Sequence, residues 1–194
     1  MAESDRERWD ARYREGGEGS ADPSPFLIAL DAILPRQRRA LDVAGGSGRN
    51  ALWLARRGLD VTLADISSVA LDLARARAEA ERLPLHTIAL DLESEPLPAG
   101  PWDVIVCVRF LWRPLFAEAA IALAENGLLV VAHPTRSNLL RHPRPGSHHL
   151  LDDGELPGLV SNLAVVSYEE GWRDDLHEAQ LVARRIPQSP ITRP

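Results

Sequence analysis

The sequence predicts an α/β fold, a doubly wound Rossmann-like sheet of seven mostly parallel strands that ends in a C-terminal antiparallel hairpin. Short apolar runs alternate with helical patterns between residues 41 and 132, which favours parallel strands covered by helices on both faces. A glycine cluster, Gly45 to Gly48, separates the first strand from the next helix, an order typical of nucleotide-binding turns. Two later apolar runs, 163–168 and 178–184, have no helical pattern between them and predict the hairpin.

The composition limits the classes of function. The chain has 194 residues, of which 45% are hydrophobic, and a formal net charge of −6, so we expect one domain and no nucleic-acid partner. All 22 basic residues are arginine, which excludes Schiff-base chemistry and a phosphate-binding P-loop, because both require a lysine. Cys107 is the only cysteine and excludes an internal disulfide. We also expect a cytoplasmic protein, since residues 1–6 lack the pattern of a signal peptide and no apolar run approaches membrane-spanning length. A monomer is the default expectation.

The N-terminal segment, about residues 1–34, is expected to form a helical lid. Its first helix carries Trp9 and Tyr13 four residues apart on one face. A glycine-rich connection leads to a second helix that begins at Pro25, and proline is favoured in a first helical turn. The lid belongs to a single predicted domain, residues 1–186, and residues 187–194 are expected to be a disordered tail.

The other elements are expected to follow the apolar runs in order. Strands are predicted at 41–43, 61–65, 85–90, 102–108 and 127–132, and helices from the glycine cluster to Gly58, from Ser67 to Pro84 and over 115–123. Residues 135–149 are expected to form a polar loop and 152–156 a helical turn. The turn of the C-terminal hairpin is placed around Gly171.

Two strands of this sheet end on an acidic residue, Asp65 after the second strand and Asp91 after the third. The carboxyl ends of parallel strands share one edge of a sheet, where such folds bind their ligands. A carboxylate in the position of Asp65 can accept both ribose hydroxyl protons, and Asp91 can accept from the exocyclic amine of adenine. The alternative for both residues is an ordinary helix cap or turn.

Several segments together resemble a class I S-adenosylmethionine-dependent methyltransferase. These segments are LDVAGGSGRNALWLARRG, VTLADIS, ALDLES and WDVIVCVRFL, followed by GLLVVAHP. The segments WDARY, PSPFL, RFLWRPLF and LVVAHPTR further resemble the small tellurite-resistance and thiopurine methyltransferase-like group. The resemblance extends from about Trp9 to Arg185 and implies S-adenosylmethionine as the cofactor and a small molecule as the methyl acceptor.

The resemblance also implies a set of cofactor-binding residues. They are Ala44, Gly45, Gly46 and Gly48 for the methionine portion, Cys107 and Val108 near the sulfonium, Asp65 for the ribose, Ile66, Asp91 and Leu92 for the adenine, and Trp9 and Tyr13 to close the site. Many relatives carry a cysteine or another small residue where this chain has Gly45.

Residues after the fourth and fifth strands are expected to bind the acceptor. They are Arg109, Phe110, Trp112, Arg113, His133, Arg136, His148 and His149. Cationic donors with aromatic walls suit a small anionic or aromatic acceptor, whereas the alternative makes the aromatic residues core and pairs the arginines with acids. His133 and Arg109 are the candidate catalytic residues, because a hydroxyl or amine acceptor must lose a proton whereas a thiolate or metalloid oxyanion need not. We expect no metal site, because the histidines lack a firm ligand spacing.

Two other functions remain open from the sequence. Gly46-x-Gly48-x-x-Ala51 with Asp65 also fits an NAD(P)-dependent Rossmann oxidoreductase, although the chain lacks a Tyr-x-x-x-Lys pair. A non-catalytic S-adenosylmethionine-binding protein would keep the same fold and pocket.

Overall fold

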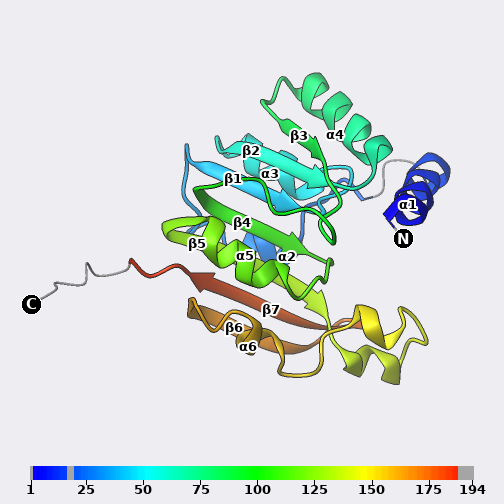
Figure 1. Cartoon of the computed structure of the whole chain (residues 1–194), viewed down its shortest axis with the longest axis vertical. Coiled ribbons are helices and arrows are strands. Elements are labelled where there is room, and N and C mark those ends of the chain that lie inside the picture. Colours follow the sequence, from blue (N-terminus) through cyan, green and yellow to red (C-terminus); the bar gives the residue numbers. More distant parts are fainter. Residues whose placement is uncertain (1, 17–19, 188–194) are drawn as a thin grey trace, which may run out of the picture.

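The computed structural model describes residues 2–16 and 20–187, which form a sheet with helices on both faces (Figure 1). The elements in chain order are α1 (Ala2–Gly16), α2 (Pro25–Ala29), β1 (Arg39–Val43), α3 (Arg49–Arg56), β2 (Asp60–Asp65), α4 (Ser68–Glu81), β3 (His86–Ala89), β4 (Trp102–Val108), α5 (Leu115–Ala122), β5 (Leu123–Pro134), the 3-10 helices η1 (Arg136–Leu140) and η2 (Ser147–His149), α6 (Leu156–Leu159), β6 (Ala164–Arg173) and β7 (Leu176–Arg184). None of the described helices is long and apolar enough to span a bilayer. Residues 188–194 of the predicted tail and residues 17–19 of the predicted connection lie outside the described residues.

The sheet has the strand order β3-β2-β1-β4-β5-β7-β6. Strands β1 to β5 pair in parallel, and β7 pairs antiparallel with both β5 and β6, which confirms the predicted Rossmann-like class with its C-terminal hairpin. After β3 the chain returns to the other side of β1, so the order reverses between β1 and β4. The arrowheads of β1, β2 and β4 in Figure 1 point toward the side on which α1 lies.

Alternate residues of the central strands build two separate cores. In β4, Val104 and Val106 belong to the cluster that contains Leu54 of α3 and side chains of α2 and α4. Ile105 lies on the opposite face, in the cluster that contains Phe116 of α5 and a side chain of α6. Both faces of β4 are therefore covered, which explains why its sequence is a continuous apolar run.

Two strands extend four or more residues beyond their predicted bounds. Strand β5 begins at Leu123 rather than at the predicted residue 127, because Leu123 pairs with Trp102 ahead of a register shift. Strand β6 continues through Gly171, which pairs with Glu178. The hairpin turn therefore lies at Asp174–Asp175, where Asp174 takes the left-handed φ of 53°, a conformation that aspartate tolerates better than most residues.

The segment between β5 and β6 also differs from its predicted form. The expected loop contains the two 3-10 helices, and the helix of this region begins at Leu156, after the expected helical turn. Pro157 in the first turn of α6 favours this later start. Before it, residues 152–155 form a turn in which the Glu155 N–H donates to the Asp152 carbonyl at 3.0 Å.

Candidate active site

The loop after β1 folds tightly because its glycines take conformations and positions that exclude side chains. Gly46 and Gly48 have φ values of 58° and 83°, in the left-handed region that favours glycine. A Cβ on Gly45 would overlap the carboxylate of Asp42 and a methyl group of Leu63. A side chain such as that of cysteine therefore does not fit at this position unless Asp42 or Leu63 moves.

Asp65, the last residue of β2, holds this loop in place. Its Oδ2 accepts a 2.8 Å hydrogen bond from the Gly46 N–H, and its Oδ1 accepts a 2.9 Å hydrogen bond from the Ser67 N–H. Burial raises the pKa of Asp65 and outweighs these hydrogen bonds, which act to lower it. The carboxylate of Asp65 thus accepts hydrogen bonds from the backbone of two turns, as the helix-cap or turn alternative expected. It also lines the cavity.

A cavity of about 130 Å³ opens at the carboxyl ends of β1 to β4, where ligands bind in open α/β sheets. Its lining is Asp5, Arg8, Trp9, Tyr13, Ala44, Asp65, Ile66, Leu90, Asp91, Leu92, Glu93, Arg109 and Phe110. Seven predicted cofactor residues are among them: Trp9, Tyr13, Ala44, Asp65, Ile66, Asp91 and Leu92. The lining combines buried carboxylates with aliphatic side chains, a composition that fits a ribose joined to a flat apolar base.

The third strand leads to Asp91 at the rim of this cavity. Its Oδ1 accepts from the Glu93 N–H at 3.1 Å and its Oδ2 from the Ser94 hydroxyl at 2.8 Å. The side chain is 7% exposed. Asp91 therefore stabilises the turn after β3 and also contributes a carboxylate to the cavity.

Helix α1 covers the cavity and is fixed to α4. The Ser67 hydroxyl donates to the Asp10 carboxylate at 2.6 Å, and the Val69 N–H donates to the same carboxylate at 3.3 Å. Tyr13 lies on the glycine loop, since a side chain on Gly46 would overlap the Tyr13 hydroxyl. Burial and the charge of Asp65 raise the pKa of Tyr13, so the phenol stays protonated at neutral pH.

The other predicted cofactor residues do not line the cavity. Gly45 and Gly48 shape the loop from behind, and Gly46 contributes the N–H that Asp65 accepts. Cys107 is fully buried, and its Sγ donates to the Phe110 carbonyl at 3.4 Å. Burial raises the pKa of this thiol to about 12, so Cys107 is not a nucleophile at neutral pH. Val108 is likewise buried at the end of β4.

His133 lies on β5 behind the cavity rather than in its lining. Its Nε2 is 2.8 Å from the His149 carbonyl oxygen, so Nε2 carries the proton and Nδ1 is the free base. Nδ1 is buried and has no hydrogen-bond partner among the described residues. Burial lowers the pKa of His133 to about 4, with a smaller contribution from the charge of Arg113, so the ring is neutral and weakly basic.

The predicted acceptor residues separate into two groups. Arg109 and Phe110 line the cavity. Arg113 pairs with Glu155 at 2.5 Å and Arg136 pairs with Asp152 at 2.7 Å, so for these two arginines the pairing alternative is correct. Trp112 packs against the core, and His148 and His149 lie against each other with ring centroids 3.9 Å apart.

Sequence interpretation missed two charged residues beside the loop. Asp42 in β1 is fully buried; its Oδ2 accepts from the Ala51 N–H at 3.0 Å, and its Oδ1 has no partner among the described residues. Burial raises the pKa of Asp42 to about 7. Arg49 begins α3, and burial together with the charge of Arg109 lowers its pKa. The sequence did carry a signal for Asp42, because an acidic residue lies within the apolar run Leu41-Asp42-Val43, where buried residues are expected.

Comparison with known proteins identifies the family. Residues 40–127 match a family model described as a methyltransferase domain, and this range contains the glycine loop, Asp65 and Asp91. Residues 40–127 thus form a methyltransferase domain of the S-adenosylmethionine-dependent class. The cofactor of this family is S-adenosylmethionine, which favours the methyltransferase interpretation over the NAD(P)-dependent oxidoreductase.

One curated relative and two solved structures illustrate what the chain is similar to, and the two structures show likeness of fold. The demethylmenaquinone methyltransferase of Thermus thermophilus is 35% identical over 120 residues, which cover 60% of this chain and 53% of that protein. A structure solved for the conversion of a disulfide bond into a thioacetal group during echinomycin biosynthesis superposes with a TM-score of 0.76 and 20% identity, covering 95% of this chain and 94% of that one. TehB from Haemophilus influenzae superposes with a TM-score of 0.72 and 20% identity, covering 91% and 67%. The chain spans about half, or less, of the curated relatives that it matches.

Proposed function

We propose that this protein transfers the methyl group of S-adenosylmethionine to a small acceptor that is anionic or aromatic. The observation that carries this proposal is the position of Asp65, which joins the glycine loop to the cavity at the switch point of the sheet. When bound, S-adenosylmethionine supplies an electrophilic methyl group on a sulfonium. The residues of the protein bind it, orient it and exclude water.

The cavity offers separate groups for the parts of this cofactor. Asp65 would accept from the ribose hydroxyls, and Ile66 and Leu92 would pack against the adenine beside Asp91. Ala44 and the glycine loop would carry the methionine portion. The unpartnered Oδ1 of Asp42 behind this loop favours a cationic ligand group nearby, because a buried carboxylate is stabilised by positive charge.

Arg109 and Phe110 would meet the acceptor. Arg109 and Arg8 bring positive charge to the same cavity, and an arginine cannot act as a base because it stays protonated. Arg109 would therefore hold an anionic acceptor in place. The low pKa of His133, about 4, makes its ring a poor general base. This combination favours acceptors that arrive already ionised, such as thiolates and metalloid oxyanions.

Helix α1 would act as a lid on this site. The predicted lid was the whole segment of about residues 1–34, but Leu27 of α2 packs in a core cluster and α2 does not line the cavity. Helix α1 contributes four cavity residues, Asp5, Arg8, Trp9 and Tyr13. Asp10 of α1 is bound by Ser67, which follows Asp65 by two residues. The position of the lid and the binding of the ribose would therefore be coupled. Water exclusion by such a lid protects a sulfonium from side reactions.

The test has a binding step and a turnover step. Calorimetric titration with S-adenosylmethionine, S-adenosylhomocysteine and NADH should give micromolar binding of the first two compounds and none of NADH. Incubation with S-adenosylmethionine and a panel of thiols, metalloid oxyanions and small aromatic acids should then release S-adenosylhomocysteine. Cofactor binding without turnover of any acceptor would favour the non-catalytic binding protein, and binding of NADH alone would restore the oxidoreductase.

A matched pair of variants tests the acceptor assignment. Arg109→Gln should raise the KM for anionic acceptors by about tenfold and leave neutral acceptors little affected, because it removes one charged hydrogen bond. Arg136→Gln, which changes an arginine outside the cavity that pairs with Asp152, should behave like the parent. Equal effects of the two variants would place the acceptor elsewhere.

A further inference from the structure

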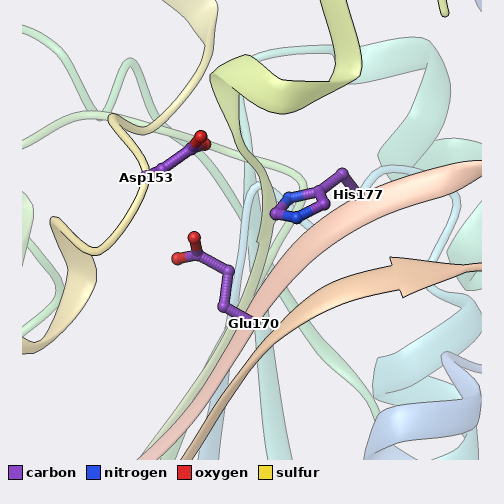
Figure 2. A group of neighbouring side chains, drawn as sticks. All are labelled: Asp153, Glu170 and His177. Atoms are coloured by element: carbon purple, nitrogen blue, oxygen red, sulfur yellow. The ribbon is translucent and has the colours of Figure 1, made fainter. Parts of the chain in front are cut away.

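Three potential metal ligands converge beside the β6–β7 hairpin. Asp153 comes from the turn before α6, Glu170 from β6 and His177 from β7, and one ligand atom from each lies within 4.8 Å of the others. Figure 2 shows the two carboxylates and the imidazole pointing toward a common space. No residue of this cluster lines the cofactor cavity.

We propose that Asp153, Glu170 and His177 bind a divalent transition-metal ion, such as Zn²⁺ or Mn²⁺, in a structural site separate from the methyltransferase cavity. Two carboxylates and one imidazole supply a charge of about −2, which balances a divalent cation. Ligand atoms around a tetrahedral ion lie about 3.4 Å apart, because each bond is about 2.1 Å long, whereas these three atoms lie within 4.8 Å of one another. Small side-chain rotations are therefore enough to close this set around a metal.

The charges next to the cluster distinguish its carboxylates from ordinary surface acids. Asp152 pairs with Arg136 at 2.7 Å, and Glu169 pairs with Arg173 at 2.8 Å. Their chain neighbours Asp153 and Glu170 form no ion pair with an arginine in the described part of the chain. In the described residues no arginine therefore compensates the negative charge of these two carboxylates.

Hydrogen bonds hold both carboxylates in place. The Ser137 hydroxyl donates to Asp153 at 2.6 Å. The Gly154 N–H donates to both oxygens of Glu170, at 3.2 and 3.0 Å, and the Tyr168 hydroxyl donates to the same carboxylate. Such second contacts orient the ligands of natural metal sites.

The imidazole of His177 is held in the same way. The Thr135 hydroxyl contacts His177 Nδ1 at 2.7 Å. A hydroxyl oxygen can accept from an imidazole N–H, so the ring keeps this contact with its proton on Nδ1. The lone pair of Nε2 is then available for a metal.

A metal in this position would join segments that are distant in sequence. It would connect the turn before α6 to both strands of the β6–β7 hairpin, next to the buried Thr135 at the end of β5. Binding to the folded chain alone raises its stability. We therefore expect the ion to raise the melting temperature without being needed for cofactor binding.

Titration calorimetry of the metal-free protein with MnCl₂ and with ZnCl₂ tests the site. We expect at least one of the two ions to bind with a stoichiometry of one per chain. Glu170→Gln and His177→Gln should each lower the affinity for that ion by more than about tenfold and remove the increase in melting temperature. Asp152→Asn and Glu169→Gln are the matched controls, because they change neighbouring acids that pair with arginine, and both should bind like the parent.

The outcomes separate this site from the cofactor site. Far-UV circular dichroism of each metal-free variant establishes that it is folded before titration. The proposal is overturned if neither ion binds the parent stoichiometrically, or if Glu170→Gln and His177→Gln bind as tightly as the controls, which would place the ion on other histidines. Because the titration contains no S-adenosylmethionine, its result is independent of the proposed methyl transfer.

Discussion

The Ser67 hydroxyl donates a 2.6 Å hydrogen bond to the Asp10 carboxylate and so joins α1 to the start of α4. Its oxygen also accepts from the Ala70 N–H at 3.1 Å and caps α4. Burial alone would raise the pKa of Asp10, but the hydrogen bonds from Ser67 and Val69 and the charge of Arg14 outweigh it and lower that pKa. Asp10 is therefore ionised at neutral pH, and its contact with Ser67 is charge-assisted.

Replacement of Asp10 should release α1. A hydrogen bond to a charged group contributes about 1.5–3 kcal/mol, and each loss of about 1.4 kcal/mol raises the population of the open state about tenfold. Asp10→Ala should therefore increase the rate of hydrogen exchange of residues 2–16 by about tenfold or more. Mass spectrometry of exchanged peptides measures this effect. Glu7→Ala, an exposed change in the same helix, is the control, and equal exchange in the two variants would contradict the anchoring role of Asp10.

Replacement of Asp65 should abolish cofactor affinity while the fold persists. Asp65→Ala removes the carboxylate that we assign to the ribose hydroxyls, and two lost charged hydrogen bonds correspond to a loss of affinity of at least about 100-fold. Calorimetric titration with S-adenosylhomocysteine measures the loss. Asp60→Ala, at the exposed start of β2, should bind like the parent. Parent-like binding by Asp65→Ala would show that the cofactor site is elsewhere.

A methyl group on Gly45 should destabilise the protein. Gly45→Ala places its Cβ on the Asp42 carboxylate and Leu63, and such overpacking costs about 1–3 kcal/mol. Thermal unfolding should show a melting temperature lower by several degrees, since 1 kcal/mol corresponds to roughly 2–4 °C in a domain of this size. Gly171→Ala, where no atom lies within 4 Å of the added Cβ, should not lower it. Equal melting temperatures for the Gly45 variant and the parent would mean that Asp42 or Leu63 moves freely.

The raised pKa of Asp42 predicts a pH dependence of stability. The pKa is about 7 in the folded chain against an ordinary value of 3.8, so between these values the native state binds more protons than the unfolded state. The free energy of unfolding therefore falls as pH rises through this window, by up to about 4 kcal/mol from this group. Below pH 3.8 and above pH 7 the contribution is constant.

Asp42→Asn removes this titration. Urea unfolding between pH 4 and pH 8 should show the variant gaining stability relative to the parent as pH rises, by up to about 4 kcal/mol over the range. Stability curves that run parallel for the variant and the parent would contradict the assigned pKa. The difference in free energy of unfolding between the variant and the parent cancels the contributions of the other titrating groups.

The central part of the fold could be predicted from sequence because its signals are local. Strand β4 lies at the predicted residues 102–108, because a continuous apolar run bounded by a proline loop permits little else. The turn of the hairpin was misplaced because Gly171 is the usual turn residue, whereas the strands pair through it and Asp174 takes the left-handed conformation. Strand pairing overrode local propensity there.

From the residues alone, the chemistry of the site was predictable where a strand end fixes the position of a residue, whereas Trp9 and Tyr13 came from the family resemblance. Asp65 and Asp91 lie at the expected edge for this reason. The partner of Arg113 is Glu155, which is distant in the chain, and no local pattern indicates such a pair. The same holds for Asp153 and His177, because their approach depends on the register of β6 and β7 and on the path of the loop before α6.

The size of the cavity has a consequence for the rate at which the cofactor enters. Pockets that enclose a small organic ligand have volumes of about 300–1,000 Å³, and the cavity beneath α1 measures about 130 Å³. We therefore expect helix α1 to move outward before a nucleoside enters. The observed association rate should then reach a plateau at high ligand concentration, and the height of that plateau is the frequency with which the Asp10–Ser67 contact breaks.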